Sequence, residues 1–148
     1  MPHSKSDKGG IMMVEDAVKI MKDMMAAMNA WDLEKAASFF TDDLVYEDVG
    51  SGMVFHGVKE YMDFAEKVRA EFPDRKWEMK SAFSDGHNIA TEAVWSGTFT
   101  QSVINPDIPA TGRHVSIRCV SITELRDGKI YRNRDYYNGL SLQQQLGV

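Results

Sequence analysis

The sequence has a single cysteine, Cys119, among its 148 residues, so the chain cannot form an internal disulfide bond. A lone cysteine is typical of a protein from a reducing compartment, and we therefore expect a cytoplasmic location. Long apolar runs are also missing. None approaches the roughly 20 residues that a membrane-spanning helix needs, so no membrane association is expected.

Positive charge is scarce: 17 Lys and Arg residues stand against 22 Asp and Glu residues, which gives a formal net charge of −5. Without a basic stripe to neutralise phosphates, nucleic acid is not an expected partner. The sequence also lacks the HExxH and CxxC motifs of metal sites, and it has no glycine-rich phosphate loop. We therefore expect no metal and no cofactor.

What remains is an ordinary globular composition, with 43% hydrophobic and 26% charged residues. A chain of this size buries about 68–70% of its unfolded surface as one domain. The first ten residues, MPHSKSDKGG, are polar and end in two glycines, which predicts a disordered tail over residues 1–10. Residues 11–148 are expected to form a single domain.

Hydrophobic periodicity separates the chain into a helical first half and a strand-rich second half. Helix signals come first, then runs of alternating residues joined by short turns, and a short helix closes the chain. This order indicates an α+β fold with an antiparallel sheet covered on one face. The predicted helices span residues 13–29, 33–40, 58–72 and 140–146, and the predicted strands span 44–48, 77–83, 89–99, 115–125 and 130–137.

Five segments recur in a recognisable order: FFTDDLVYEDVGSG, FHGVKEYMDF, GTFT…PATGRHV, LRDGKIYRNRDYYNG and QQQLG. Their order and spacing resemble the SnoaL-like polyketide cyclases, within the nuclear transport factor 2-like superfamily, over roughly residues 13–147. The resemblance implies a cone-shaped, strongly bent antiparallel sheet wrapped around three N-terminal helices, the cystatin-like α+β barrel. It also implies an apolar pocket inside the cone and a homodimer formed through the sheet face.

The same resemblance implies where the chemistry lies. The RDYY segment that contains Asp135 resembles the stretch of limonene epoxide hydrolase with its catalytic aspartate, and SnoaL-like cyclases place their acid/base aspartate there too. Tyr46 and Asp48 fall where the hydrolase has a tyrosine and an asparagine that hold its water. Ala93 and Trp95 replace the arginine and second aspartate that the hydrolase needs, which argues against epoxide hydrolysis.

Strand alternation and the same resemblance indicate the other site positions. The histidine that assists SnoaL-like cyclases maps near Ser121. A two-residue Asp127-Gly128 turn would place Val120 opposite Asp135, whereas a three-residue turn with a glycine bulge would place Cys119 there, and the resemblance favours the second. The residues that we expect to contact substrate are Trp95, Ala93, Ile117, Cys119, Asn133, Tyr131, Met62, Trp31 and His56.

These assignments predict a small enzyme for a hydrophobic, oxygenated molecule such as a polyketide, terpenoid or steroid-like ketone. Asp135 would abstract a proton next to a carbonyl, because a desolvated carboxylate has a raised pKa. Tyr46, with Asp48 or a water, would stabilise the enolate during cyclisation, isomerisation or dehydration. Two alternatives stay open: a protein that carries its ligand unchanged, and a dimeric scaffold whose pocket is filled by Met and Trp.

Overall fold

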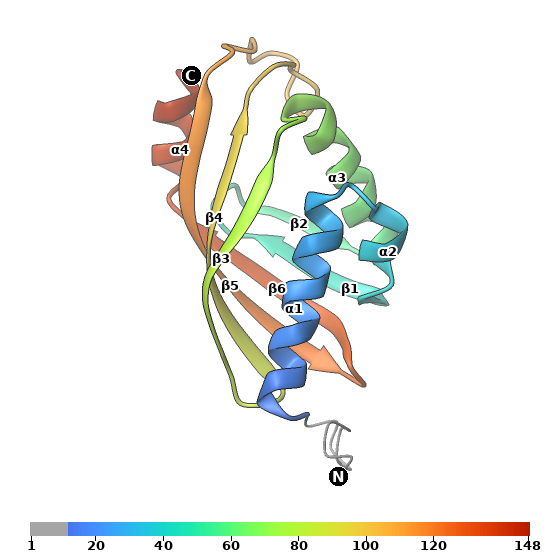
Figure 1. Cartoon of the computed structure of the whole chain (residues 1–148). Helices are drawn as coiled ribbons and strands as arrows, with labels where there is room; N and C mark the ends of the chain where they lie inside the picture. Colours follow the sequence, from blue (N-terminus) through green and yellow to red (C-terminus); the bar gives the residue numbers. More distant parts are fainter. Residues whose placement is uncertain (1–11) are drawn as a thin grey trace.

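The computed structural model describes residues 12–148, so the predicted tail at residues 1–10 lies outside the described residues. The described residues form four helices and a six-stranded, strongly curved and unclosed sheet, with the first three helices on one side of it (Figure 1). This confirms the predicted α+β fold class. The elements are α1 (Val14–Asn29), α2 (Leu33–Ala37), β1 (Phe40–Asp48), β2 (Met53–His56), α3 (Val58–Glu71), β3 (Lys76–Ser84), β4 (Asn88–Thr98), β5 (His114–Arg126), β6 (Lys129–Tyr137) and α4 (Gly139–Leu146).

The strands lie in the order β2-β1-β6-β5-β4-β3. Four of the five neighbouring pairs are antiparallel hairpins or meanders, as the alternating pattern predicts. The fifth pair, β1 with β6, is parallel and joins the first strand of the chain to the last. Turn residues predict pairing only between strands that follow one another in the sequence, so the sequence did not predict this pair. The four-residue strand β2 was not predicted, because a strand this short shows too little alternation.

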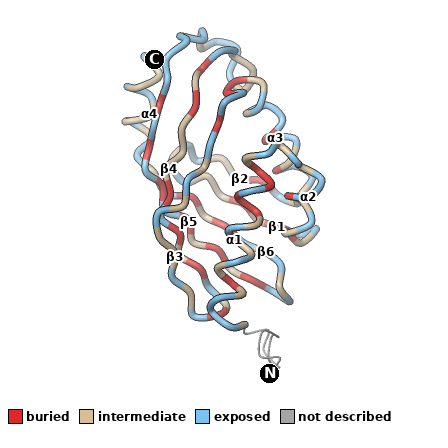
Figure 2. Tube along the Cα trace, in the orientation of Figure 1, coloured by how far each residue is buried: buried red, intermediate tan, exposed pale blue. Residues whose placement is uncertain are grey.

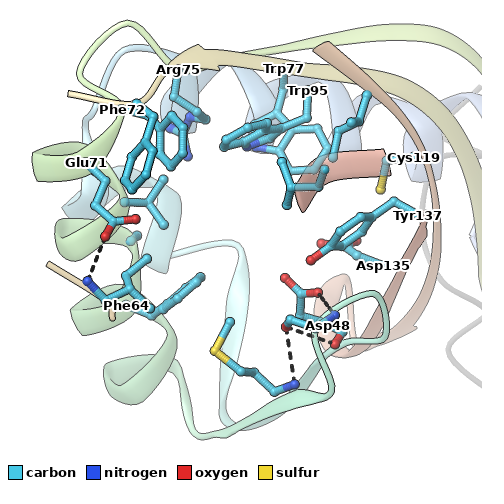
Figure 3. A pocket seen from close by; sticks show the side chains of 18 of the residues that line it. Asp48, Phe64, Glu71, Phe72, Arg75, Trp77, Trp95, Cys119, Asp135 and Tyr137 are labelled. Atoms are coloured by element: carbon cyan, nitrogen blue, oxygen red, sulfur yellow. Dashed lines mark hydrogen bonds between the residues drawn. The ribbon is translucent and has the colours of Figure 1, made fainter. Parts of the chain in front are cut away.

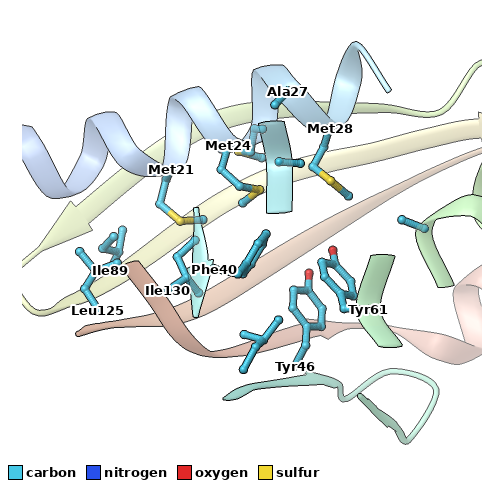
Figure 4. Close-up of a cluster of buried hydrophobic side chains, with 14 of the residues drawn as sticks. Met21, Met24, Ala27, Met28, Phe40, Tyr46, Tyr61, Ile89, Leu125 and Ile130 are labelled. Carbon is cyan, nitrogen blue, oxygen red and sulfur yellow. The ribbon is translucent and has the colours of Figure 1, made fainter. Parts of the chain in front are cut away.

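The concave face of the sheet is filled by α1, whose methionines recur every three or four residues and face inward. Met21, Met24 and Met28 pack with Phe40 and Ile130 in the main core (Figure 4). Buried positions alternate with exposed ones along the strands beneath this helix (Figure 2). Flexible thioether side chains fill the irregular space between a helix and a curved sheet well.

A side chain caps the start of α2. The side chain of Asp32 accepts a hydrogen bond of 3.1 Å from the backbone N–H of Lys35, which satisfies one of the free amides at the helix start. Among residues 12–148, no helix is both long and apolar enough to cross a membrane.

A second, smaller hydrophobic cluster lies apart from the main core. Phe72, Phe99 and Val115 form it, and the C-terminal helix α4 packs against it through Leu142 and Leu146. The side-chain oxygen of a glutamine in this helix accepts a hydrogen bond from a backbone N–H of β5. This bond holds α4 along the part of β5 that extends beyond the end of β6. Space between the two clusters is left open, and it is there that the cavity described below lies.

The β5–β6 hairpin differs from both predicted registers. The turn is the two-residue Asp127-Gly128 type, with positive φ angles of 52° and 76° that suit a tight hairpin. A bulge then follows, because Leu125 pairs with Ile130 whereas Glu124 pairs with Arg132. Tyr131 is the extra residue, and an extra residue shifts every later pair by one position.

The bulge places Ser121 opposite Asp135. Val120 and Cys119, the two partners considered from the sequence, are therefore both wrong as direct partners. Because Cys119 and Ser121 are two positions apart, they lie on the same face of the strand. The predicted pocket-facing side of β5 is therefore retained, although the pairing is displaced.

Candidate functional site

A cavity of about 310 Å³ opens between α3, α4, the inner face of the sheet and the loop that joins β4 to β5 (Figure 3). Its volume lies at the lower end of the range for small-molecule sites, and its walls are mainly apolar and aromatic. Only a few polar side chains interrupt them. The lining residues are Met28, Tyr46, Asp48, Ser51, Met53, Tyr61, Phe64, Ala65, Val68, Glu71, Phe72, Arg75, Trp77, Trp95, Phe99, Ile104, Asn105, Ile108, Ile117, Cys119, Asp135, Tyr137, Leu142 and Leu146.

Asp135 on β6 forms the centre of the polar end of this cavity. Only 5% of the residue is exposed. The Oδ1 atom accepts hydrogen bonds from the Ser121 hydroxyl at 2.5 Å and from the Asn133 amide at 2.9 Å. The Oδ2 atom accepts a hydrogen bond from the Tyr46 hydroxyl. Donors from three strands therefore fix the orientation of this carboxylate at the cavity wall.

Burial raises the pKa of Asp135 above its ordinary value, and the nearby negative charge of Asp48 acts in the same direction. The donors Ser121, Tyr46 and Asn133 oppose this rise, because they stabilise the charged form. The net direction is upward. A buried carboxylate of this kind takes up a proton more readily than an exposed one, as a general base must.

Two stacked tyrosines extend this polar end. The rings of Tyr46 and Tyr61 are nearly parallel, at an angle of 14°, with their centres 3.8 Å apart (Figure 4). Burial raises the pKa of both hydroxyls, and the charge of Asp135 adds to the rise. Both therefore remain neutral O–H groups near neutral pH, able to donate hydrogen bonds.

Asp48 and Tyr137 complete the polar end. Asp48 lies beside Asp135 in the β1–β6 register, and its Oδ1 accepts a hydrogen bond of 3.1 Å from the backbone N–H of Ser51. Burial raises the pKa of Tyr137, and the Asp48 carboxylate raises it further. Tyr137 was not among the residues expected to contact substrate. It lies two positions after Asp135 on β6, however, so strand alternation places both side chains on the same face.

The ring of Tyr137 lies directly on Gly50, where an added Cβ would come within 2.4 Å of it. We expect Gly50→Ala to displace this ring and to cost about 1–3 kcal/mol, the usual range for overpacking. Chemical denaturation measures the loss. The double variant Gly50→Ala/Tyr137→Leu removes the clash, so it should recover part of the lost free energy of unfolding. A double variant less stable than either single variant would contradict this account.

The loop between β4 and β5 covers part of the cavity and is tied to the end of α3. Glu71 is 6% exposed, and its Oε2 accepts hydrogen bonds from the backbone N–H groups of Val103 at 2.7 Å and Ile104 at 2.8 Å. The backbone carbonyl of Glu71 also accepts a hydrogen bond of 2.9 Å from Thr100. Sequence reasoning missed Glu71, because its partners are distant backbone amides that no side-chain motif indicates.

We expect Glu71→Ala to loosen this loop while the sheet stays intact. Removing the acceptor leaves the amides of Val103 and Ile104 without a partner, so their hydrogen exchange should accelerate markedly. The exposed Glu66, on the same helix, provides the matched control as Glu66→Ala. Unchanged exchange at both amides in Glu71→Ala would show that the carboxylate does not hold the loop.

The structure brings six of the predicted site residues together at the cavity: Asp135, Tyr46, Asp48, Trp95, Ile117 and Cys119. Burial raises the pKa of the Cys119 thiol to about 12, so it stays un-ionised at neutral pH and contributes an apolar surface. The six other predicted residues do not line this cavity: Ala93, Asn133, Tyr131, Met62, Trp31 and His56.

The reasons differ between these six. Ala93 is part of the main core, and Met62 packs against that core from α3. Asn133 lies behind the wall, where it bonds to Asp135. The bulge turns Tyr131 away, so that its hydroxyl donates to Glu124 at 3.3 Å.

The remaining two lie outside the cavity for local reasons. His56 is exposed at the end of β2. Trp31 has a positive φ of 57° between α1 and α2, and its indole N–H donates to the Pro73 carbonyl at 3.3 Å. Its ring therefore packs outside the cavity wall. Among residues 12–148, no three His, Cys, Asp or Glu side chains are grouped so that they would hold a metal ion.

Comparison with solved structures shows the same fold in proteins of low sequence identity. A SnoaL-like protein from Jannaschia sp. CCS1 has a TM-score of 0.80 at 15% identity, over 91% of this chain and 94% of that chain. A protein with a ketosteroid isomerase-like fold from Catenulispora acidiphila, in complex with trimethylamine, has a TM-score of 0.75 at 18% identity, over 88% and 93%. An LEH-like epoxide hydrolase from M. tuberculosis has a TM-score of 0.73 at 19% identity, over 90% of each chain.

The similarity to these three structures establishes the fold alone. No curated protein sequence matches the chain significantly. The family model for SnoaL-like polyketide cyclases, however, matches residues 18–146, which include all six strands and α4. The chain therefore belongs to the SnoaL-like polyketide cyclase family.

Proposed function

We propose that this protein binds a hydrophobic, oxygenated small molecule in the cavity and carries out cofactor-independent acid/base chemistry on it, with Asp135 as the base. One observation carries the proposal: a buried carboxylate lies on the wall of an otherwise mainly apolar cavity. A carboxylate in such surroundings has the raised pKa that proton abstraction from carbon requires.

The reaction begins with transfer of a proton from the carbon next to a substrate carbonyl to a carboxylate oxygen of Asp135. The electrons of the broken C–H bond move to the carbonyl oxygen, which becomes an enolate. The Tyr46 hydroxyl, with a water, stabilises that charge, and the Tyr137 hydroxyl is a further candidate donor on the same wall. Aldol-type ring closure, isomerisation and dehydration all proceed from such an enolate.

The second candidate is a non-catalytic binding protein of the same fold. The observation that favours it is the hydrogen bonding of Asp135, whose two oxygens already accept from Ser121, Asn133 and Tyr46. A carboxylate with three donors is also suited to holding three strands together. In that case the cavity would hold a ligand without changing it.

A ligand screen separates these candidates. Polyketide, steroid and terpenoid ketones are tested for a rise in melting temperature, and each hit is then incubated and analysed for product. A ligand at a hundredfold excess over its Kd stabilises the fold by about 2.7 kcal/mol. Product formed by the wild type supports the enzyme, and recovery of every bound ligand unchanged supports the binding protein. No response to any ketone would contradict both.

A further inference from the structure

Arg75, in the segment that joins α3 to β3, is a buried cation on the cavity wall. Only 5% of the residue is exposed, and it lies among the lining residues. Over residues 12–148, no carboxylate lies within ion-pair distance of it. Its Nη2 donates to the backbone carbonyl of Met28, and its buried Nε has no acceptor within the described part of the chain.

Burying a guanidinium without a counter-ion is costly, and the protein compensates only in part. The indole ring of Trp31 lies 3.9 Å from the guanidinium carbon, which provides a cation–π contact. Burial lowers the pKa of Arg75 to about 10, so the side chain keeps its positive charge at neutral pH. Neither the ring nor the Met28 carbonyl neutralises that charge.

The other charged residues around the cavity do not pair with Arg75, so its charge is available to a ligand. Glu71 is on the same wall, but its carboxylate accepts from the amides of the β4–β5 loop. Asp48 and Asp135 lie at the far side of the cavity from Arg75 (Figure 3). Arg75 is therefore the only cation among the described residues that line the cavity, and it lies across aromatic walls from Asp48 and Asp135.

We propose that the ligand of this cavity carries a carboxylate that pairs with Arg75, at the end opposite the group that reacts at Asp135. The inference rests on the proposed function and names its substrate class: an aromatic or polycyclic keto acid. A planar guanidinium matches a carboxylate in two parallel hydrogen bonds. The carboxylates of Asp135 and Asp48 repel the acid end, so the ketone is directed toward Asp135.

The test compares two probes of the same shape, one anionic and one neutral: 2-naphthoate and 2-naphthamide. Calorimetric titration of the wild type should show naphthoate binding at least about tenfold more tightly, because a charged pair in a desolvated site is stronger than a neutral hydrogen bond. Arg75→Met keeps the apolar stem and should abolish this preference, whereas Arg75→Lys should keep part of it.

The matched control is Arg69→Met. Arg69 also lies near the Trp31 ring, at 5.6 Å, but it is exposed and does not line the cavity. This variant should keep the wild-type preference. Circular dichroism shows whether each variant folds. If Arg75→Met unfolds, the wild-type comparison of acid with amide together with Arg75→Lys still tests the proposal.

Each outcome separates this inference from the proposed function on which it rests. Equal binding of naphthoate and naphthamide by the wild type overturns the role of Arg75 but leaves ligand binding in the cavity supported. Loss of the preference in Arg69→Met as well as in Arg75→Met also overturns it, because the effect is then not specific to the buried cation. Absence of binding by either probe, while neutral ketones bind, overturns the acid but not the proposed function. Absence of binding by every probe contradicts both.

Discussion

Asp135→Asn is expected to abolish turnover while the chain stays folded. Asparagine keeps the shape of the side chain, and its oxygen can still accept from Ser121 and Asn133. The amide cannot take up a proton from carbon, so kcat/KM on any ketone that the wild type converts should fall by about 10²–10⁴-fold. Steady-state kinetics measure the loss, and circular dichroism checks the fold. Asp42→Asn, at an exposed position, is the control.

The pH dependence of stability gives an independent readout of the same carboxylate. The pKa of Asp135 in the folded protein is raised above its ordinary value of 3.8, so the folded state holds this proton more tightly than the unfolded state. This group therefore destabilises the fold as pH rises from 3.8 through the raised pKa. Over that range the free energy of unfolding of the wild type should fall relative to Asp135→Asn, and kcat/KM should rise. A constant difference between the two proteins would argue against the shift.

Ile130→Ala is expected to cost about 2–5 kcal/mol of the free energy of unfolding, as deletions of this size from a packed core do. Ile130 is 1% exposed. It pairs with Phe40 on β1 and with Leu125 on β5, so it lies where β6 joins these two strands. The cavity left there cannot collapse easily, because three strands hold its walls. Urea denaturation at constant pH measures the difference.

The matched control for this core position is Phe83→Ala on β3. Phe83 loses a larger side chain, but it is 71% exposed. We expect a change of about 0.5 kcal/mol or less, which is typical of surface positions. Equal losses in the two variants would mean that burial does not determine the cost at these positions.

Local features of the fold were predictable from the sequence to within a few residues. The predicted helix over residues 13–29 corresponds to α1 at Val14–Asn29, and that over 58–72 corresponds to α3 at Val58–Glu71. The strand predicted at 115–125 corresponds to β5 at His114–Arg126. Hydrophobic period, caps and turn residues are properties of neighbouring positions, so a single sequence contains them.

Features that depend on distant contacts were not predictable in the same way. The bulge at Tyr131 adds one residue to a strand, and no local pattern distinguished it from a longer turn. Arginine is usually a surface residue, so the sequence gives no sign that Arg75 is buried. Only the packing of Trp31 and Met28 around it buries the charge. The side chain of Glu71 bonds to amides that lie more than 30 residues away. Sequence reasoning therefore identified the Asp135 end of the cavity but not the Arg75 end.

The place of β6 in the sheet has a consequence for the route by which the chain folds. β6 lies between β1 and β5, yet it follows both in the sequence. Until it inserts, the β1–β2 hairpin and the β3–β4–β5 meander share no strand pairing. Joining them requires closure of a loop that spans most of the domain, and such non-local pairing is slow. The open edges of β1 and β5 are then exposed to pairing with other chains, so aggregation during refolding should increase with protein concentration.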